Sequence, residues 1–479
     1  MDLSVPTNDL TVTIDATTPR AMDLAAPFDL LATAPCGRAF VHTGSAGVLS
    51  MDVDSHGNMI VVGGFYATID FGDGMRASKN GGAFVAKYDA SCKLVFAKTY
   101  DNAQFDGVAI DGSDRIYLKG YVGNSVDVGT GVLFGPGSNN ILIAALDASG
   151  TTLWGKLFGA KGASPGVGSL AVDAAGNVMV GGFANGPAID FGGGLVGQGS
   201  ANGRWIWLFR LDAKGAFVWS EGWGWGTTSS TNGITSIGLD RAGDLIVAGS
   251  GQGTIDFGGG PITFPTASST LFLLKRSATT GAHIVARAIP GAGQVLSRFR
   301  VDATTGDLVC SGQLYDVADF GAGPIGFLSG GKLTPSRAFV ARLRDDTLTA
   351  VWSRAYGSNP TTNVSDLYSL ALSPNGEIDV TVNMNVPVDF GCGAIGPTST
   401  APPWAFALVH LSADGTCKSS ASYGDGLGYG ATLTPAGSLV YAGSFTNTIG
   451  GPGIAAMTNP QPSPSPPRLG DGFFIRLGQ

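Results

Sequence analysis

The stretch DAAGNVMVGGF at residues 173–183, followed by IDFGGG at residues 189–194, carries the pattern that decides the fold. An Asp begins a short turn that ends in Gly, and an apolar run follows. An Asp side chain can accept hydrogen bonds from backbone N–H groups two or three residues later, and Gly supplies the positive φ that ends such a turn. The stretch therefore predicts the corner of a β-hairpin.

The same corner recurs seven times between residues 54 and 437. Its first position holds Asp in five copies and Ser or Thr in two: Asp54, Asp111, Asp173, Asp240, Asp302, Ser373 and Thr434. Apolar residues lie one and three positions before each corner, as Val53 and Met51 do, with mostly small residues between them. This period of two predicts one β-strand before each corner, and the following apolar run predicts another.

Each copy continues with two more apolar segments, such as residues 84–88 and 94–99 in the first copy. Four short strands joined by short connections predict an antiparallel meander. Meanders stacked around a common axis bury one another's faces and leave no long open edge. We therefore predict an all-β fold, a seven-bladed β-propeller of four-stranded antiparallel blades.

The last copy lacks a fourth strand, because its third strand at residues 473–477 lies at the end of the sequence. Residues 38–44 resemble the fourth strand of the first copy, with Phe40 matching Phe96. We predict that this N-terminal strand completes the last blade, where Phe40 would lie beside Ile475. The ring would then be closed by segments from both ends of the sequence.

The chain is expected to have two regions. Residues 1–37 carry Asp-Leu pairs among Thr, Ala and Pro, with too few large apolar residues to offset the entropy of ordering. We predict that they form an extended or disordered tether. Residues 38–479 would form the propeller, and we expect the protein to be a monomer.

Composition supports a fold of short strands and argues against several partners. Only two of the 36 acidic residues are Glu, which favours helices, and 75 residues are Gly, which favours turns. A net charge of −8 leaves no basic surface for nucleic acid. The sequence contains no apolar run long enough to span a membrane, and its first segment lacks the basic and apolar regions of a signal peptide.

The five cysteines show no metal-ligand spacing, so we predict neither a metal site nor a cofactor. Cys310 lies in an apolar strand and is expected in the core. Cys392 and Cys417 belong to one copy, and Cys36 and Cys92 would be neighbours in a closed ring, so either pair is a candidate disulfide. Another carboxylate recurs before Phe-Gly or a variant of it, and we interpret it as a turn or salt-bridge residue: Asp70, Asp127, Asp190, Asp256, Asp319 and Asp389.

These repeats resemble a known family. The segments at residues 173–183, 189–194 and 84–89 are similar to the bacterial seven-bladed β-propeller repeats called SBBP repeats, over residues 38–479. The acidic tether followed by such repeats is similar to predicted surface lipoproteins of myxobacteria. This resemblance implies an extracytoplasmic, cell-surface setting and a propeller fold, but it implies no activity, and a signal peptide or lipobox is not visible in the sequence.

The clearest departure from the repeat is Arg298 with Arg300, two positions that are mostly small in the other copies. In the first copy Asp52 takes the place of Arg300. Alternation along a strand puts both guanidinium groups on one side. One interpretation is an anion site for a carboxylate, phosphate or acidic sugar in the central channel. The other, which the sequence favours, is a salt bridge to Asp52.

Aromatic residues suggest a second candidate site. Trp205 and Trp225 match no recurring position and lie near Asn202 and Arg204 in a Gly- and Ser-rich region. Aromatic faces stack on sugar rings, so these four residues form a weaker candidate glycan site. Chance placement is the competing interpretation.

No catalytic residues are predicted, because the four histidines fall in different copies without a neighbouring nucleophile. The leading hypothesis is a non-catalytic extracytoplasmic scaffold that recognises a glycan or protein through propeller loops. One alternative is a polysaccharide or peptide lyase or hydrolase with a site in the central funnel, and another is a structural cell-envelope protein. Fold alone does not choose among them.

Overall fold

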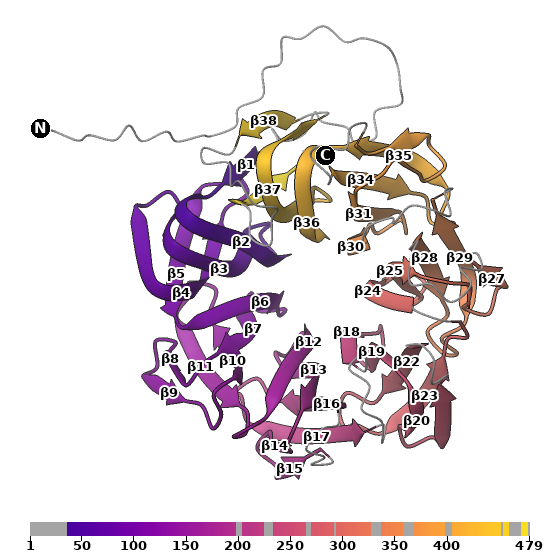
Figure 1. The fold of residues 1–479 in the computed structure, drawn as a ribbon, viewed down its shortest axis with the longest axis horizontal. Helices are drawn as coiled ribbons and strands as arrows, with labels where there is room; N and C mark the ends of the chain where they lie inside the picture. Colours follow the sequence, from indigo (N-terminus) through magenta and orange to yellow (C-terminus); the bar gives the residue numbers. More distant parts are fainter. Residues whose placement is uncertain are drawn as a thin grey trace, which may run out of the picture.

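The computed structural model describes residues 36–197, 204–224, 233–264, 270–291, 294–326, 337–357, 367–397, 405–451, 454–458 and 471–477. All regular elements of this described part are β-strands, and they form seven blades around a central axis (Figure 1). No helix in it is long and apolar enough to cross a membrane. The predicted all-β, seven-bladed architecture is confirmed.

Within each blade, antiparallel strands follow one another from the axis outward. The first blade contains β2 (Val41–Val53), β3 (Met59–Asp70), β4 (Met75–Tyr88) and β5 (Leu94–Asp101). The second contains β6 (Ala103–Ile110), β7 (Ile116–Val122), β10 (Asn140–Leu146) and β11 (Thr152–Phe158). The third contains β12 (Ser164–Val172), β13 (Val178–Asn185), β16 (Arg204–Leu211) and β17 (Phe217–Gly224).

The remaining blades repeat this order. The fourth contains β18 (Gly233–Leu239), β19 (Leu245–Gly251), β22 (Thr270–Arg276) and β23 (His283–Ala288). The fifth contains β24 (Gln294–Val301), β25 (Leu308–Leu314), β28 (Arg337–Leu343) and β29 (Ala350–Tyr356). The sixth contains β30 (Leu367–Leu372), β31 (Ile378–Met384), β34 (Ala405–Leu411) and β35 (Cys417–Ser422). The seventh contains β36 (Gly424–Leu433), β37 (Leu439–Gly451), β39 (Asp471–Arg476) and β1 (Cys36–Ala39).

Short hairpins between the second and third strands add to blades two to six. They are β8 (Ser125–Asp127) with β9 (Val132–Phe134), β14 (Ile189–Asp190) with β15 (Leu195–Val196), β20 (Gly253–Asp256) with β21 (Pro261–Phe264), β26 (Ala318–Asp319) with β27 (Pro324–Ile325), and β32 (Val388–Asp389) with β33 (Ala394–Ile395). In the seventh blade β38 (Ile454–Thr458) pairs with β37. In the first blade β3 and β4 themselves extend outward to form this hairpin.

The repeated carboxylate before Phe-Gly fixes the turn of these hairpins. Asp190 accepts hydrogen bonds from the backbone N–H groups of Gly192 and Gly194, at 2.7 and 3.0 Å. Both glycines have positive φ, which a residue with a Cβ rarely adopts. Equivalent bonds form at Asp70, Asp127, Asp256, Asp319 and Asp389. The predicted turn role of these carboxylates is confirmed.

The N-terminal strand closes the ring, as predicted, but in a different register. Gly37 of β1 pairs with Ile475 of β39, and the N–H group of Phe40 donates to the carbonyl of Gly472 at 3.0 Å. The predicted pairing of Phe40 with Ile475 is therefore wrong. Its cause is a misaligned repeat, because Cys36 rather than Phe40 occupies the position of Phe96.

Phe40 instead belongs to a ring of large residues that follow or end each outer strand. Its counterparts in the first six blades are Tyr100, Phe158, Trp223, Ile289, Tyr356 and Tyr423. Phe40 is 1% exposed, and its ring lies against Phe71, Phe84 and Phe474. The last blade thus carries a large residue at the same position as the other six blades.

Both candidate cysteine pairs are disulfides. Cys36 and Cys92 join β1 to the turn before β5, across the junction between the last and first blades. Cys392 and Cys417 join the β32–β33 hairpin to β35 within the sixth blade. Cys310 is a buried free thiol, as expected for a core residue.

Candidate binding site in the central channel

The seven inner strands β2, β6, β12, β18, β24, β30 and β36 surround the axis of the ring (Figure 1). Asp52 and Ala109 on these strands are partly exposed, and Arg300 is exposed, so solvent reaches this central channel. Each inner strand has a β-bulge at the same level, four to six residues before the hairpin corner. The bulges keep the seven strands in equivalent positions at the channel wall.

Two positions on each inner strand, two and four residues before the corner, face the next blade. In the fourth blade a Cβ on Gly238 would lie 2.8 Å from the ring of Phe299. In the sixth blade the Ser369 hydroxyl donates to the carbonyl of Ala431 at 3.3 Å. Side chains here must be small because inner strands of adjacent blades approach closely. This packing explains the small residues that recur in the sequence.

Arg298 and Arg300 occupy these two positions in the fifth blade. Arg298 is half-buried and Arg300 is exposed, so the long side chains carry their guanidinium groups beyond the blade contact into the channel. Each donates a hydrogen bond to a carbonyl of its own strand, Ser297 at 3.0 Å and Phe299 at 3.1 Å. Most of their five N–H donors remain available to a ligand.

Asp52 lies across the channel on β2, but it does not form a direct salt bridge with either arginine. Its carboxylate accepts hydrogen bonds from the backbone N–H groups of Val53 at 2.9 Å and Ile110 at 3.1 Å. Among the described residues, no carboxylate lies within 4 Å of the Arg298 or Arg300 guanidinium. Arg300 and Asp52 instead attract each other through space.

Enclosure by the channel wall shapes the charges of this site. Burial raises the pKa of Asp52 to about 6, although its backbone hydrogen bonds and Arg300 oppose the rise. Burial, followed by repulsion from Arg300, lowers the pKa of Arg298 to about 10. The surrounding channel wall also lowers the pKa of Arg300 by desolvation, although its side chain is exposed, against the attraction of Asp52. Both guanidinium groups nevertheless stay charged near neutral pH, whereas Asp52 titrates in the physiological range.

A second charged pair on the wall was not anticipated from the sequence. Asp106, the bulge residue of β6, accepts a hydrogen bond from the Lys119 ammonium at 2.9 Å. Lys119 and Asp106 thus form an ion pair. The Asp106 carboxylate also attracts the Arg298 guanidinium through space, which favours the charged form of Arg298. Gly107 beside it permits this arrangement, because a Cβ there would lie 2.6 Å from the Lys119 side chain. The only hint of this pair in the sequence is a charged residue, Asp106, within an inner strand that is otherwise mostly uncharged.

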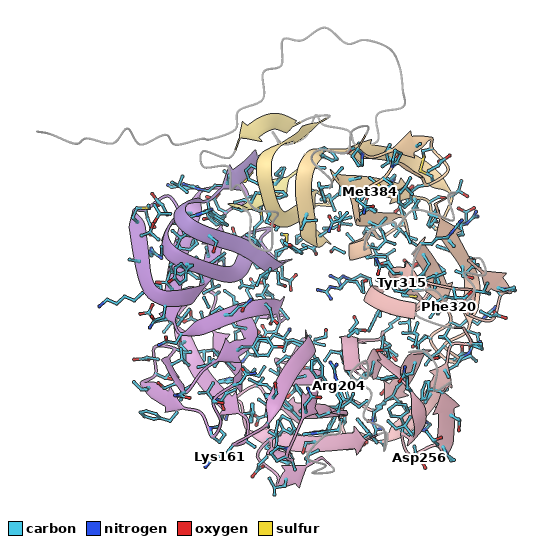
Figure 2. All side chains as sticks on the ribbon, in the orientation of Figure 1. Lys161, Arg204, Asp256, Tyr315, Phe320 and Met384 are labelled. Atoms are coloured by element: carbon cyan, nitrogen blue, oxygen red, sulfur yellow. A yellow bond between two sulfur atoms is a disulfide. The ribbon has the colours of Figure 1, made fainter. Side chains whose placement is uncertain are left out.

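The second candidate site is only partly described. Trp225 and Asn202 lie outside the described residues. Trp205 is 2% exposed, and its indole N–H donates to the carbonyl of Gly186 at 3.3 Å. Arg204, which is labelled in Figure 2, stacks over the ring of Phe183, with its guanidinium carbon 3.4 Å from the ring centroid. Neither face of Trp205 is therefore open for sugar stacking in this conformation.

The burial of Trp205 has a signal in the sequence. Residues 205–209 form an unbroken apolar run in β16, the third strand of its blade. Such runs are typical of strands covered on both faces, whereas a half-exposed strand alternates. The position of Trp205 beside a Gly-rich segment was a weaker indicator than this run.

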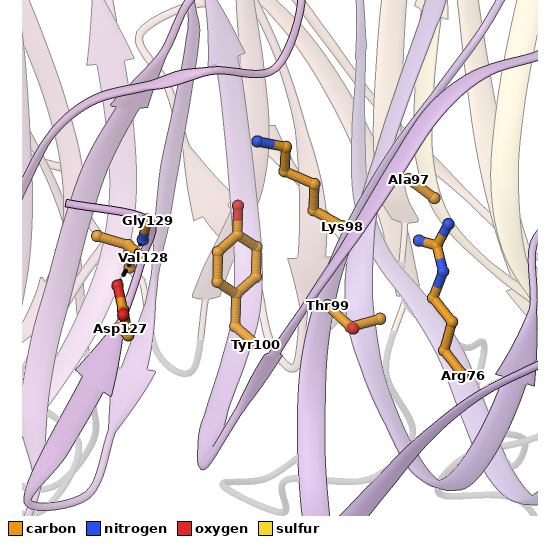
Figure 3. Close-up of a pocket in the computed structure, with 8 residues that line it drawn as sticks. All are labelled: Arg76, Ala97, Lys98, Thr99, Tyr100, Asp127, Val128 and Gly129. Atoms are coloured by element: carbon orange, nitrogen blue, oxygen red, sulfur yellow. Dashed lines mark hydrogen bonds between the residues drawn. The ribbon is translucent and has the colours of Figure 1, made fainter. Parts of the chain in front are cut away.

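An open pocket lies on the outer wall between the first and second blades (Figure 3). It is lined by Arg76, Ala97, Lys98, Thr99, Tyr100, Asp127, Val128 and Gly129. The Asp127 carboxylate is engaged by the N–H groups of Gly129 and Gly131, at 2.7 and 3.2 Å. Asp127 therefore serves the turn, and Arg76 forms an ion pair with Asp73.

A Ser, His and Asp cluster at the first hairpin corner does not have catalytic geometry. The Ser55 hydroxyl and the Asp114 carboxylate both contact Nδ1 of His56, at 3.1 and 3.0 Å. A catalytic triad instead needs the nucleophile on one ring nitrogen and the carboxylate on the other. Asp54 completes a group of possible metal ligands with His56 and Asp114, but Lys87 lies 2.8 Å from its carboxylate and already neutralises it.

Comparisons with known proteins assign the chain to no family. No family model and no curated protein matches it. Among solved structures, the Dos1 propeller has 9% identity and a TM-score of 0.46, covering 95% of this chain and 97% of that chain. U3-55K has 10% identity and a TM-score of 0.46, and the match covers 92% of this chain and 98% of that chain. A quinohemoprotein alcohol dehydrogenase from Pseudomonas putida HK5 has 12% identity and a TM-score of 0.44, and the match covers 91% of this chain and 76% of that chain.

The fold defines the chain as a seven-bladed β-propeller protein. The three structures differ in kind from one another, and identities near one tenth transfer neither a site nor an activity to this chain. The function must therefore be argued from the residues of the channel.

Proposed function

We propose that this protein is a non-catalytic binding scaffold outside the cytoplasm, which recognises a glycan or protein by admitting an anionic group of that ligand into the central channel. The observation that carries the proposal is the pair Arg298 and Arg300, whose guanidinium groups face solvent in the channel without an ion-pair partner among the described residues.

The arginines contribute nothing evident to the packing of the ring. The equivalent positions of other blades hold small side chains that let adjacent inner strands approach. Two neighbouring cations on one strand also repel each other, and no carboxylate among the described residues forms an ion pair with either. Residues that destabilise a fold without improving its packing are expected at sites that bind a ligand. Arginine suits that role because its planar donors match carboxylate and phosphate oxygens.

The absence of a catalytic arrangement among the described residues favours binding over hydrolysis or elimination. The Ser55, His56 and Asp114 cluster lacks triad geometry, and Asp52 lies opposite cations without a neighbouring nucleophile. Two disulfides support a setting outside the reducing cytoplasm. The similarity to SBBP repeats and to myxobacterial surface lipoproteins belongs to the same proposal, as does a monomeric state.

The proposal is tested with a glycan and peptide array that contains acidic, neutral and basic members. We expect the wild-type protein to retain acidic members and the Arg298→Ala, Arg300→Ala double variant to lose them. The matched control is Lys156→Ala, which removes an exposed cation from the outer wall. Equal retention by the double variant and the wild type would contradict the channel site, and equal losses in the control would reduce the effect to net charge.

A further inference from the structure

The charges of the channel are separated across its width. Arg298 and Arg300 extend from β24 of the fifth blade, whereas Asp52 is held on β2 of the first blade. Asp106 on the second blade also lies on this side, but Lys119 neutralises it. The channel therefore presents two cations on one side and one uncompensated carboxylate on the other.

Asp52 is held in place by groups that leave part of its carboxylate available. Each oxygen accepts one backbone hydrogen bond, from Val53 or from Ile110 of the next blade. A carboxylate oxygen can accept more than one hydrogen bond, so each retains acceptor capacity. Asp52 is partly exposed, and the distance to the arginines exceeds that of an ion pair. The opposed charges are therefore not consumed by a direct ion pair among the described residues and remain available to a ligand.

Resting on the proposed function, we infer that the channel selects a zwitterionic group, with a carboxylate bound by Arg298 and Arg300 and an ammonium bound by Asp52. Amino acids and amino sugars that carry both an ammonium and a carboxylate share this chemistry. Such a group matches both sides of the channel, whereas a simple anion matches only the arginines. A dianion such as phosphate would in addition be repelled by Asp52.

The ligand series that tests this inference compares three probes with four carbon atoms that differ in charge, together with one longer zwitterion. It consists of γ-aminobutyrate, butyrate and butylamine, with 6-aminohexanoate as a longer zwitterion, each titrated calorimetrically into the wild-type protein at pH 8. We expect at least one zwitterion to bind about tenfold more tightly than butyrate, a difference of about 1.4 kcal/mol. Butylamine should bind more weakly than either, because the arginines repel it.

Two isosteric variants separate the roles of the residues. Asp52→Asn keeps an oxygen that can accept the Val53 or Ile110 hydrogen bond but removes the charge. It should abolish the preference for a zwitterion and retain or strengthen butyrate binding, because the repulsion of the butyrate carboxylate is removed. Asp106→Asn is the matched control, since Lys119 already neutralises that carboxylate, and it should retain the preference. Thermal denaturation of both variants checks that the ring is intact.

Measuring the preference for the zwitterion over butyrate as a function of pH distinguishes a ligand-binding role of Asp52 from a purely structural one. With a pKa of about 6, Asp52 loses its charge as the pH falls from 8 to 5. The preference for the zwitterion over butyrate should therefore decline through pH 6, while the guanidinium groups of Arg298 and Arg300 keep their charge.

The outcomes separate this inference from the proposed function. If butyrate and the zwitterions bind equally and Asp52→Asn changes neither, zwitterion selection is refuted while an anion site stands. If the arginine double variant binds acidic array members and all probes as the wild type does, both proposals are refuted. If one zwitterion binds tightly and depends on Asp52, Arg298 and Arg300 together, both are supported.

Discussion

Arg476 in the last blade donates a hydrogen bond to the carbonyl of Ala90 in the first blade, 2.8 Å away and 386 positions earlier in the sequence. The same relationship links other neighbours, because Lys87 donates to Ala148 at 3.0 Å and Arg210 to Ala278 at 2.9 Å. The junction where the two ends of the chain meet is therefore built like the other blade junctions.

Phe40 is the apolar anchor of this junction, and Phe40→Ala should reduce the free energy of unfolding by about 3 to 5 kcal/mol. The ring is 1% exposed, so its removal leaves a cavity among Phe71, Phe84 and Phe474. Urea denaturation followed by tryptophan fluorescence measures the loss. Phe134→Ala, at a residue that is 80% exposed, is the control and should change little. Similar losses in both variants would contradict closure through Phe40.

Reduction of the Cys36–Cys92 disulfide should weaken the same junction. The bridge closes a segment of 56 residues and ties β1 to the first blade, so a Cys36→Ala, Cys92→Ala variant should lose about 2 to 4 kcal/mol. Denaturation of this variant and of Cys392→Ala, Cys417→Ala gives the comparison. We expect the first to lose more stability, because its bridge joins two blades and encloses a longer segment. The reverse order would argue against a special role for the junction.

The buried pair of Lys87 and Asp54 should be sensitive to loss of the cation. Burial favours the neutral form of Asp54, but hydrogen bonds from Lys87 and Asn58 outweigh burial and lower its pKa. Lys87→Ala leaves this carboxylate buried without its partner, which should cost about 3 to 5 kcal/mol at pH 7. Lys156→Ala on the exposed outer wall should cost under about 0.5 kcal/mol.

The same pair has a defined pH dependence. Because the folded pKa of Asp54 is lowered, its contribution to stability is present above the ordinary value of 3.8 and is lost as the pH falls through the folded pKa. The difference between Lys87→Ala and the wild type should therefore shrink on acidification. A difference that is constant from pH 7 to pH 3 would show that lost packing, rather than the charge, explains the effect.

His410 makes the sixth blade pH-sensitive in the opposite direction. A hydrogen bond to Asp379 at 2.9 Å raises its pKa, with help from Glu377 at 3.4 Å and against burial. Its contribution to stability is thus complete below the ordinary pKa of 6.5 and is lost as the pH rises through the folded value. The Tm of the wild type should fall over this range more than that of His410→Arg, which keeps a permanent cation. Parallel Tm profiles would contradict this role.

The repeat made most of the fold predictable, because hairpin corners such as Asp173 to Gly176 depend on local hydrogen bonds that the sequence encodes directly. The register of the closing strand was not predictable in the same way. Phe40 and Phe96 are both aromatic, and only the pairing of Cys36 with Arg476 shows which belongs to which position.

The channel site was predictable in part. Arg298 and Arg300 stand out because long cations replace small residues, whereas the roles of Asp106 and Lys119 depend on which strands meet across a bulge. The burial of Trp205 was indicated by the unbroken apolar run at residues 205–209, whereas the neighbouring Gly-rich segment indicated exposure. Departures from the repeat were therefore better guides to the candidate site than isolated aromatic residues.

Anomalous diffraction from crystals of the protein soaked in bromide would decide whether the channel arginines hold an anion. We expect a bromide peak within hydrogen-bonding distance of Arg298 or Arg300, absent from crystals of the double alanine variant. Bromide peaks elsewhere on the protein, with none beside either arginine in an open channel, would refute the anion site.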